Sequence, residues 1–182
     1  MKNTLNMLRL RNCGKQQHSS WRKPPLGFIK INVDASFSSK SGSAVLAMVG
    51  RNFKGEFCFG KSWFCMALSP LMAEAAALHK ATQFVEEMDG HNVIFESDNQ
   101  ELITCIRQAD KPPPWEAKTL ILAIRKLSNC HPDFMFSFVS REGKRVADWI
   151  TRYSITEQSP IFWTNRPPNE LTSLLYQDGL HF

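Results

Sequence analysis

The chain has 182 residues, of which 43% are hydrophobic and 21% charged, and such a composition is typical of one globular domain with a substantial core. No apolar run approaches the roughly 18 residues of a membrane span, which argues against an integral membrane protein. The formal net charge is +5, and the five cysteines lack C-x-x-C spacing, which argues against a disulfide-stabilised protein and against a zinc site.

The positive charge is concentrated at the N-terminus. Residues 1–33 contain seven Lys and Arg and no acidic residue, so the other 149 residues carry a net charge of −2. We expect residues 1–20 to form a poorly ordered basic arm. Three roles fit it equally: contact with nucleic-acid phosphates, an organellar transit peptide, or the remnant of a polyprotein linker. No apolar segment follows the charges, so a secretory signal is not expected. We expect an intracellular protein of the nucleus, mitochondrion or chloroplast.

The first half of the chain predicts three strands and a long helix. Two prolines and a glycine in residues 21–27 predict a stiff segment before the first strand. Alternating and apolar segments joined by short polar turns predict an antiparallel meander of strands at 28–36, 44–51 and 56–64. A serine followed by proline and an Ala/Leu/Glu-rich run predicts a helix over 70–88.

The second half alternates between strands and helices. It predicts strands at 93–98 and 134–139, helices at 99–108, 115–129 and 144–154, and a possible short helix near the C-terminus, in "NELTSLLYQDG". This order predicts an α/β fold in which helices flank a mixed sheet. We expect one domain over residues 21–155, with residues 156–182 packing on it as a C-terminal extension.

Four acidic residues lie in four separate predicted elements: Asp34, Glu74, Asp98 and Asp148. Three of them have simple structural explanations. Glu74 could favour the helix dipole, Asp98 could cap the following helix, and Asp148 could be an exposed helix residue. Asp34 is harder to explain, because it interrupts a strand with apolar residues on both sides, where an unpaired carboxylate is costly.

Several motifs occur together in the same order as in a known family. "W..PP.G.IKINVDASF", "LSPLMAEAAAL", "FESDNQ.L" and "FVSREGKRVAD" resemble the ribonuclease H family, most closely the plant ribonuclease H-like domains that look derived from retroelements. The resemblance covers roughly residues 21–182. It implies a ribonuclease H-like fold, with a five-stranded mixed sheet whose first three strands are antiparallel. It also implies that the four acids meet at one edge of the central strands.

The resemblance implies a function as well. It is that of a metal-dependent endonuclease that hydrolyses the RNA strand of RNA–DNA hybrids. Asp34, Glu74, Asp98 and Asp148 would be the catalytic residues and would hold two Mg²⁺ ions, which Mn²⁺ could replace. The nucleic acid would be an RNA–DNA hybrid or double-stranded RNA.

Four further residues are candidate nucleic-acid contacts. Ser36 follows Asp34 by two residues and should share its face of the strand. Asn99 and Gln100 lie at a predicted helix N-terminus, where backbone N–H groups attract phosphate. Lys144 could contact phosphate or could disturb the metal site.

Three departures from the family pattern favour an alternative to the active endonuclease. The loop before the last helix, "SREGK", lacks the histidine of many cellular relatives, and the nearest histidine, His131, precedes the last strand. Lys144 stands where the plant motif usually has asparagine. The segment between Asp98 and Asp148 looks short for a basic hybrid-gripping handle. The alternative is a catalytically weak or inactive module that binds nucleic acid or protein. A 3′–5′ exonuclease is disfavoured, because "DAS" replaces the D-x-E pair of those enzymes.

The C-terminal tail is rich in aromatic residues: Phe162, Trp163, Tyr176 and Phe182. We expect them to cover the domain. If they were uncovered they would form an apolar patch, and such a patch or the basic arm could bind a protein partner. Trp149, next to Asp148, is expected to pack rather than to stack on a base.

Overall fold

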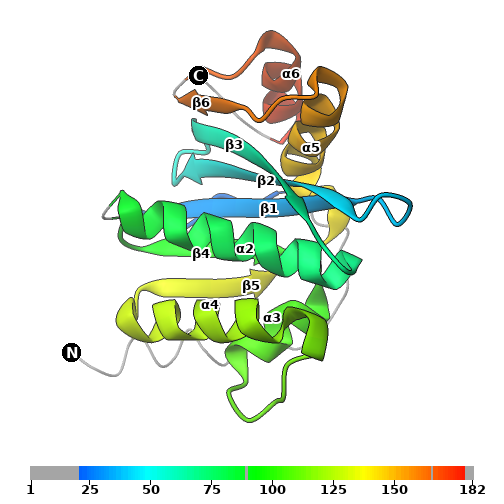
Figure 1. Cartoon of the computed structure of the whole chain (residues 1–182). Coiled ribbons are helices and arrows are strands. Elements are labelled where there is room, and N and C mark those ends of the chain that lie inside the picture. The colour runs from blue at the N-terminus through cyan, green and yellow to red at the C-terminus, as the bar shows by residue number, and fades with distance from the viewer. Residues whose placement is uncertain (1–20, 89, 165, 179–182) are drawn as a thin grey trace, which may run out of the picture.

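The computed structural model describes residues 21–88, 90–164 and 166–178, and the predicted basic arm lies outside them. Its elements, shown in Figure 1, are β1 (Ile29–Phe37), β2 (Ser43–Asn52), β3 (Phe57–Met66), α2 (Pro70–Glu87), β4 (Val93–Ser97), α3 (Gln100–Arg107), η1 (Trp115–Ala117), α4 (Lys118–Cys130), β5 (Phe134–Phe138), η2 (Arg141–Lys144), α5 (Arg145–Glu157), β6 (Phe162–Thr164) and α6 (Asn169–Gln177). In this part of the chain, no helix is long and apolar enough to cross a membrane.

The strands form one mixed sheet with the order β5-β4-β1-β2-β3-β6. Strands β1, β2 and β3 form the predicted antiparallel meander, and β4 and β5 run parallel to β1. Helices α2, α3 and α4 cover one face, and α5 and α6 cover the other (Figure 1). The predicted α/β class, the antiparallel first three strands and the helices on both faces are therefore confirmed.

Alternation along β1 divides its side chains between the two faces. Ile31 and Val33 are fully buried in the core beneath α2, α3 and α4. A polar row occupies the alternate positions and therefore the opposite face: Lys30, Asn32, Asp34 and Ser36. Asp34 is therefore one member of a polar row on the face that α5 and α6 cover.

Helix α2 places one of the predicted acids. Ser69 caps it, since its hydroxyl accepts a hydrogen bond from the Met72 amide at 3.1 Å, and Pro70 occupies the first turn. Ala73, Ala77 and Ala81 are fully buried, and such small side chains let the helix lie close to the sheet. The predicted helix 70–88 is confirmed, and its N-terminal turns lie at the end of the sheet where β1 and β4 finish (Figure 1).

The sheet has six strands, whereas five were expected. The additional strand, β6, pairs antiparallel with the edge of β3 and aligns Phe162 with Lys61 and Thr164 with Phe59. A strand of three residues has too few positions to show an alternating pattern, which is why the sequence does not reveal it. Its pairing protects the backbone of an otherwise open sheet edge.

The C-terminal extension builds a second core. Leu171 and Leu175 of α6 are fully buried with Val146 and Ile150 of α5 against the sheet. The aromatic tail covers the domain in part: Trp163 lies against Trp149 and Tyr153, whereas Phe162 and Tyr176 are about half exposed. Phe182 lies outside the described residues. Trp149 stacks on Tyr153 with 4.8 Å between ring centroids, as expected for a packing residue.

Candidate active site

Asp34 lies near the end of the central strand β1 and is only 6% exposed. Its Oδ2 accepts a hydrogen bond from the Thr151 hydroxyl at 2.8 Å, and its Oδ1 accepts one from the Lys144 ammonium. Both oxygens of the buried carboxylate are thereby satisfied, which offsets the cost of removing it from water.

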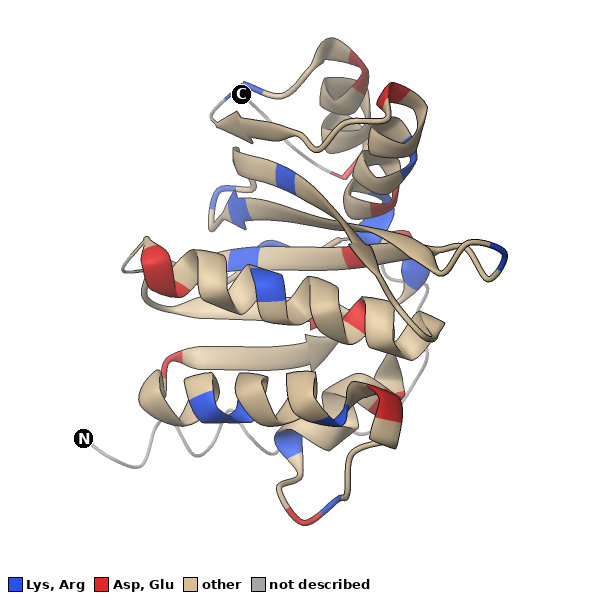
Figure 2. Ribbon diagram, in the orientation of Figure 1, with Lys and Arg blue, Asp and Glu red and all other residues tan. Residues whose placement is uncertain are grey.

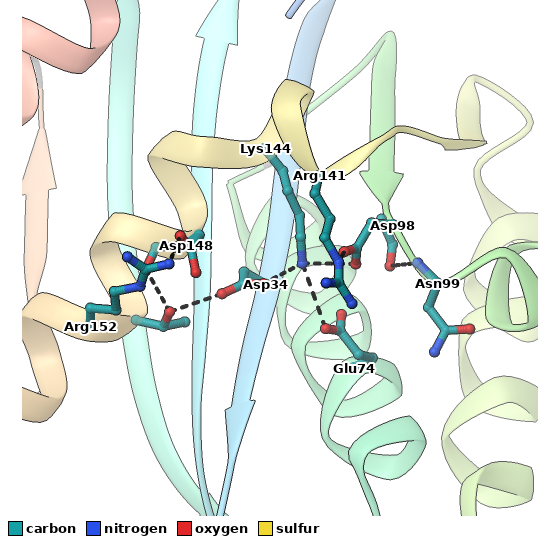
Figure 3. Close-up of polar contacts among 10 residues, drawn as sticks. Asp34, Glu74, Asp98, Asn99, Arg141, Lys144, Asp148 and Arg152 are labelled. Atoms are coloured by element: carbon teal, nitrogen blue, oxygen red, sulfur yellow. Dashed lines mark hydrogen bonds and ion pairs between the residues drawn. The ribbon is translucent and has the colours of Figure 1, made fainter. Parts of the chain in front are cut away.

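Glu74 and Asp98 approach the same ammonium from two other elements (Figure 3). Asp98 directly follows β4, and its Oδ1 lies 2.7 Å from Lys144 Nζ. Glu74 is the fifth residue of α2, and its Oε1 lies 3.7 Å from Lys144 Nζ. Since β1 and β4 are parallel neighbours, both strands present their C-terminal ends to the first turns of α2.

The electrostatics of this cluster are strongly coupled. Burial raises the pKa of Glu74 to about 8; Lys144 opposes the shift, and the charges of Asp34 and Asp98 add to it. Burial alone would lower the pKa of Lys144, but the three carboxylates outweigh it and the pKa is raised. Glu74 Oε2 is buried without a hydrogen-bond partner. The cluster thus has one fixed cation and too much negative charge for it to balance.

Asp148 stands slightly apart from the other three acids. It lies in the first turn of α5, and its Oδ2 is 2.6 Å from Arg152 one turn later. Its side chain is 39% exposed, so it is the most accessible of the four carboxylates. Thr151 links it to Asp34, because the same hydroxyl lies 2.8 Å from the Asp148 backbone oxygen.

The four acids line one open depression of about 720 Å³. Arg141, Arg145 and Arg152 also line it and give it a basic border. Figure 2 shows the acidic position of β1 and the one near the N-terminus of α2 at the same end of the molecule as the basic positions around the start of α5. The arrangement brings carboxylates that could bind cations next to guanidinium groups that could bind phosphate.

The predicted nucleic-acid contacts take different positions. Ser36 lines the depression, whereas Asn99 and Gln100 do not belong to its lining. Asn99, rather than Asp98, caps α3 by accepting a hydrogen bond from the Leu102 amide at 2.9 Å. Gln100 is exposed and donates to Thr104. Lys144 is only 5% exposed, so its ammonium lies within the acidic cluster instead of on a phosphate-facing surface.

Sequence reasoning missed the residues that hold the acids. Thr151 was missed, although a buried hydroxyl three residues after Asp148 on the apolar face of α5 is a signal that could have identified it. Arg141, which lies 3.5 Å from Asp98, was also missed. His131 stacks on Phe134 at the opposite end of β5 from the site, so it does not replace the missing loop histidine.

The donor chemistry fits a divalent cation. The cluster offers carboxylate oxygens, which Mg²⁺ and Mn²⁺ prefer, and one buried oxygen of Glu74 has no partner. Yet within residues 21–88, 90–164 and 166–178, no three acidic, histidine or cysteine side chains are grouped so that they could hold a metal ion as they stand. The Lys144 ammonium lies between three of the acids, and Arg152 pairs with the fourth.

Comparisons with known proteins agree with this fold. The family described as "Reverse transcriptase-like" matches residues 32–154. A protein of Arabidopsis thaliana named "Putative ribonuclease H protein" is 24% identical over 166 residues, covering 88% of this chain. The chain spans only 26% of that relative's length.

Solved ribonuclease H structures are similar to most of the described chain. RNase H1 of the halophilic archaeon Halobacterium salinarum has a TM-score of 0.65 at 16% identity, covering 72% of this chain and 99% of its own. LC11-RNase H1, isolated from compost by a metagenomic approach and solved with an RNA/DNA hybrid, has a TM-score of 0.64 at 18% identity, covering 71% and 98%. The chain therefore has the ribonuclease H-like fold and belongs to the reverse transcriptase-like family.

Proposed function

We propose that the chain is a ribonuclease H-type hydrolase that cuts the RNA strand of RNA–DNA hybrids in a divalent-metal-dependent reaction. The observation that carries this proposal is the meeting of Asp34, Glu74, Asp98 and Asp148 in one depression, although they come from four separate elements. The name of the Arabidopsis relative and the hybrid bound to LC11-RNase H1 support the same substrate class.

The four carboxylates would be the metal ligands. Bound divalent ions would supply activation of a water molecule and stabilisation of charge at the phosphate. Asp34 would be the central ligand, because Lys144 connects its carboxylate to Glu74 and Asp98 on one side and Asp148 lies on its other side (Figure 3). Thr151 fixes the carboxylate plane of Asp34, which would keep its oxygens oriented toward the depression.

Recognition of the nucleic acid would use the border of the depression. Arg141, Arg145 and Arg152 line it and can neutralise phosphates, and their side chains are at least partly exposed. Ser36 lies in the lining, where a hydroxyl could bond to a ribose 2′-hydroxyl. Such contacts read backbone shape instead of base sequence, so we expect cleavage with little sequence preference.

A labelled hybrid tests the proposal directly. Wild-type chain in Mg²⁺ or Mn²⁺ should cut the RNA strand, and cutting should stop when a chelator removes the metal. Asp34→Asn should abolish cutting. Asp110→Asn, which removes an exposed acid from the loop after α3, should leave it unchanged. A folded wild-type chain that cuts no strand in either metal would refute the hydrolase.

One observation favours a second candidate, a module that binds hybrids without cutting them. The Lys144 ammonium already contacts three of the four acids, so the metal-binding capacity of the site is reduced. Fluorescence anisotropy with the same hybrid separates the two functions. Salt-dependent binding without RNA-strand cleavage would identify the binding module.

A further inference from the structure

The ammonium of Lys144 takes a central position among three carboxylates. It donates a hydrogen bond to Asp34 Oδ1 and lies 2.7 Å from Asp98 Oδ1 and 3.7 Å from Glu74 Oε1 (Figure 3). The three acids come from β1, α2 and the end of β4. A divalent ion bound between these carboxylates would need the same three oxygens.

The packing of the neighbouring helix fixes the backbone of Lys144 next to the acids. Lys144 is the last residue of η2 and immediately precedes α5, whose Val146, Ala147 and Ile150 are fully buried in the second core. Lys144 itself is 5% exposed. Its backbone cannot move away from the cluster without disturbing the packing of α5.

We propose that Lys144 is a tethered cation that occupies the position between Asp34, Glu74 and Asp98 and thereby weakens divalent-metal binding there. This inference depends on the proposed function in one respect: it takes these three carboxylates as the metal ligands. A metal ion that entered this position would have to break the contacts of Lys144 with all three acids. It would also have to bind within a few ångströms of a positive charge, and that repulsion is strong in a partly buried site.

The remaining charge leaves a second position less obstructed. One ammonium against three carboxylates leaves this part of the site negative, so it still attracts cations. On the Asp148 side of Asp34, the competing cation is Arg152, whose side chain is 75% exposed and can turn into solvent. We therefore expect a divalent ion to bind on the Asp148 side more readily than between Asp34, Glu74 and Asp98.

Titration of the full chain with Mn²⁺, followed by electron paramagnetic resonance of the free ion, tests the proposal. Lys144→Asn should bind Mn²⁺ at least about tenfold more tightly than wild type, because it removes the competing charge from the three oxygens. Lys54→Asn is the matched control: it makes the same substitution at an exposed lysine in the turn between β2 and β3, away from the acids. It should change Mn²⁺ affinity by less than about twofold. Equal affinities of wild type and Lys144→Asn would overturn the proposal.

A measurement on the wild-type chain does not depend on the variant folding. Reductive methylation followed by mass spectrometry, without added metal, should modify the exposed Lys40 and spare Lys144. If Lys144 were modified as fast as Lys40, its ammonium would not occupy the position between the acids, and the proposal would be wrong. Neither readout requires hydrolysis, so a chain that fails to cut hybrids would count against the proposed function alone.

Discussion

Two buried charge clusters lie along β1 and β4, and they differ in the balance between acids and cations. The first is the Arg51 cluster: Lys30, Asn32, Arg51, Glu96 and Asp178. The second is the site cluster: Asp34, Glu74, Asp98 and Lys144. Strand β1 contributes Asn32 to the first and Asp34 to the second. Strand β4 contributes Glu96 to the first and leads to Asp98 of the second.

The Arg51 cluster is closed and nearly neutral. Arg51 is fully buried and pairs with Asp178 at 2.9 Å and with the Asn32 side-chain oxygen at 2.8 Å. Glu96 lies 2.7 Å from Lys30 and accepts a hydrogen bond from Asn32. Each acid has a cation, and Asp178 has two, since Arg145 lies 2.8 Å from its other oxygen. The guanidinium of Arg51 also stacks on Trp21, 3.7 Å from its ring centroid.

The site cluster opens into the depression and has three carboxylates for one buried ammonium. Burial raises the pKa of Glu74 to about 8 there; Lys144 opposes the shift, and the charges of Asp34 and Asp98 add to it. Buried charge by itself therefore does not distinguish the candidate site from the rest of this fold. The site cluster differs in having more acids than buried cations at the wall of an open depression, where a further cation could still bind.

The largest effect on stability is expected from a substitution that disrupts the Arg51 cluster. Arg51→Met would remove a fully buried guanidinium from Asp178 and Asn32 and leave Asp178 paired with the partly exposed Arg145 alone, so we expect a loss of about 3 kcal/mol in the free energy of unfolding. Urea denaturation measures it. Arg22→Met, an exposed change in the segment before β1, is the control and should cost less than about 0.5 kcal/mol. A loss below about 1 kcal/mol for Arg51→Met would show that the cluster does not stabilise the fold as argued.

The second prediction concerns the pH dependence of stability, which arises from Glu74 in the site cluster. Because the pKa of Glu74 is raised from 4.5 to about 8 in the folded chain, the folded state binds more protons than the unfolded state between these values. Stability should therefore fall as pH rises through this window, by at most about 1.4 kcal/mol per pH unit.

The comparison is with Glu74→Gln, which cannot titrate and should lose less stability over the same window. Urea unfolding at pH 5, 6, 7 and 8 in a chelator measures both proteins. Glu87→Gln, at the exposed end of the same helix, should follow wild type. Wild-type and Glu74→Gln curves that stay parallel across this window would contradict the assignment of the raised pKa to Glu74.

The smallest effect concerns an exposed ion pair of the site. Arg152 lies 2.6 Å from Asp148, but its side chain is 75% exposed, so Arg152→Gln should change the free energy of unfolding by less than about 1 kcal/mol. If Arg152 binds phosphate, the variant should lower the salt dependence of hybrid binding by about one unit of slope. An unchanged slope would remove Arg152 from the nucleic-acid interface.

Much of this arrangement could be predicted from the sequence, and the rest could not for physical reasons. Local signals such as the Ser69 cap and the alternation along β1 identify elements and buried faces, and the motif order suggested which acids meet. The partner of a buried charge carries no local signal. Arg51 and Asp178 are 127 residues apart, and Lys144 and Asp34 are 110 apart, so only the fold brings them together.

The most direct test of the account compares hybrid cleavage by wild type and Lys144→Asn in Mn²⁺, under single-turnover conditions with a labelled RNA strand. We predict faster RNA-strand cleavage by Lys144→Asn, and no cleavage by the double variant Asp34→Asn/Lys144→Asn. Cleavage that persists without Asp34 would contradict the assignment of the acids. A folded Lys144→Asn chain that cleaves no faster than wild type would contradict the view that the tethered ammonium limits the site.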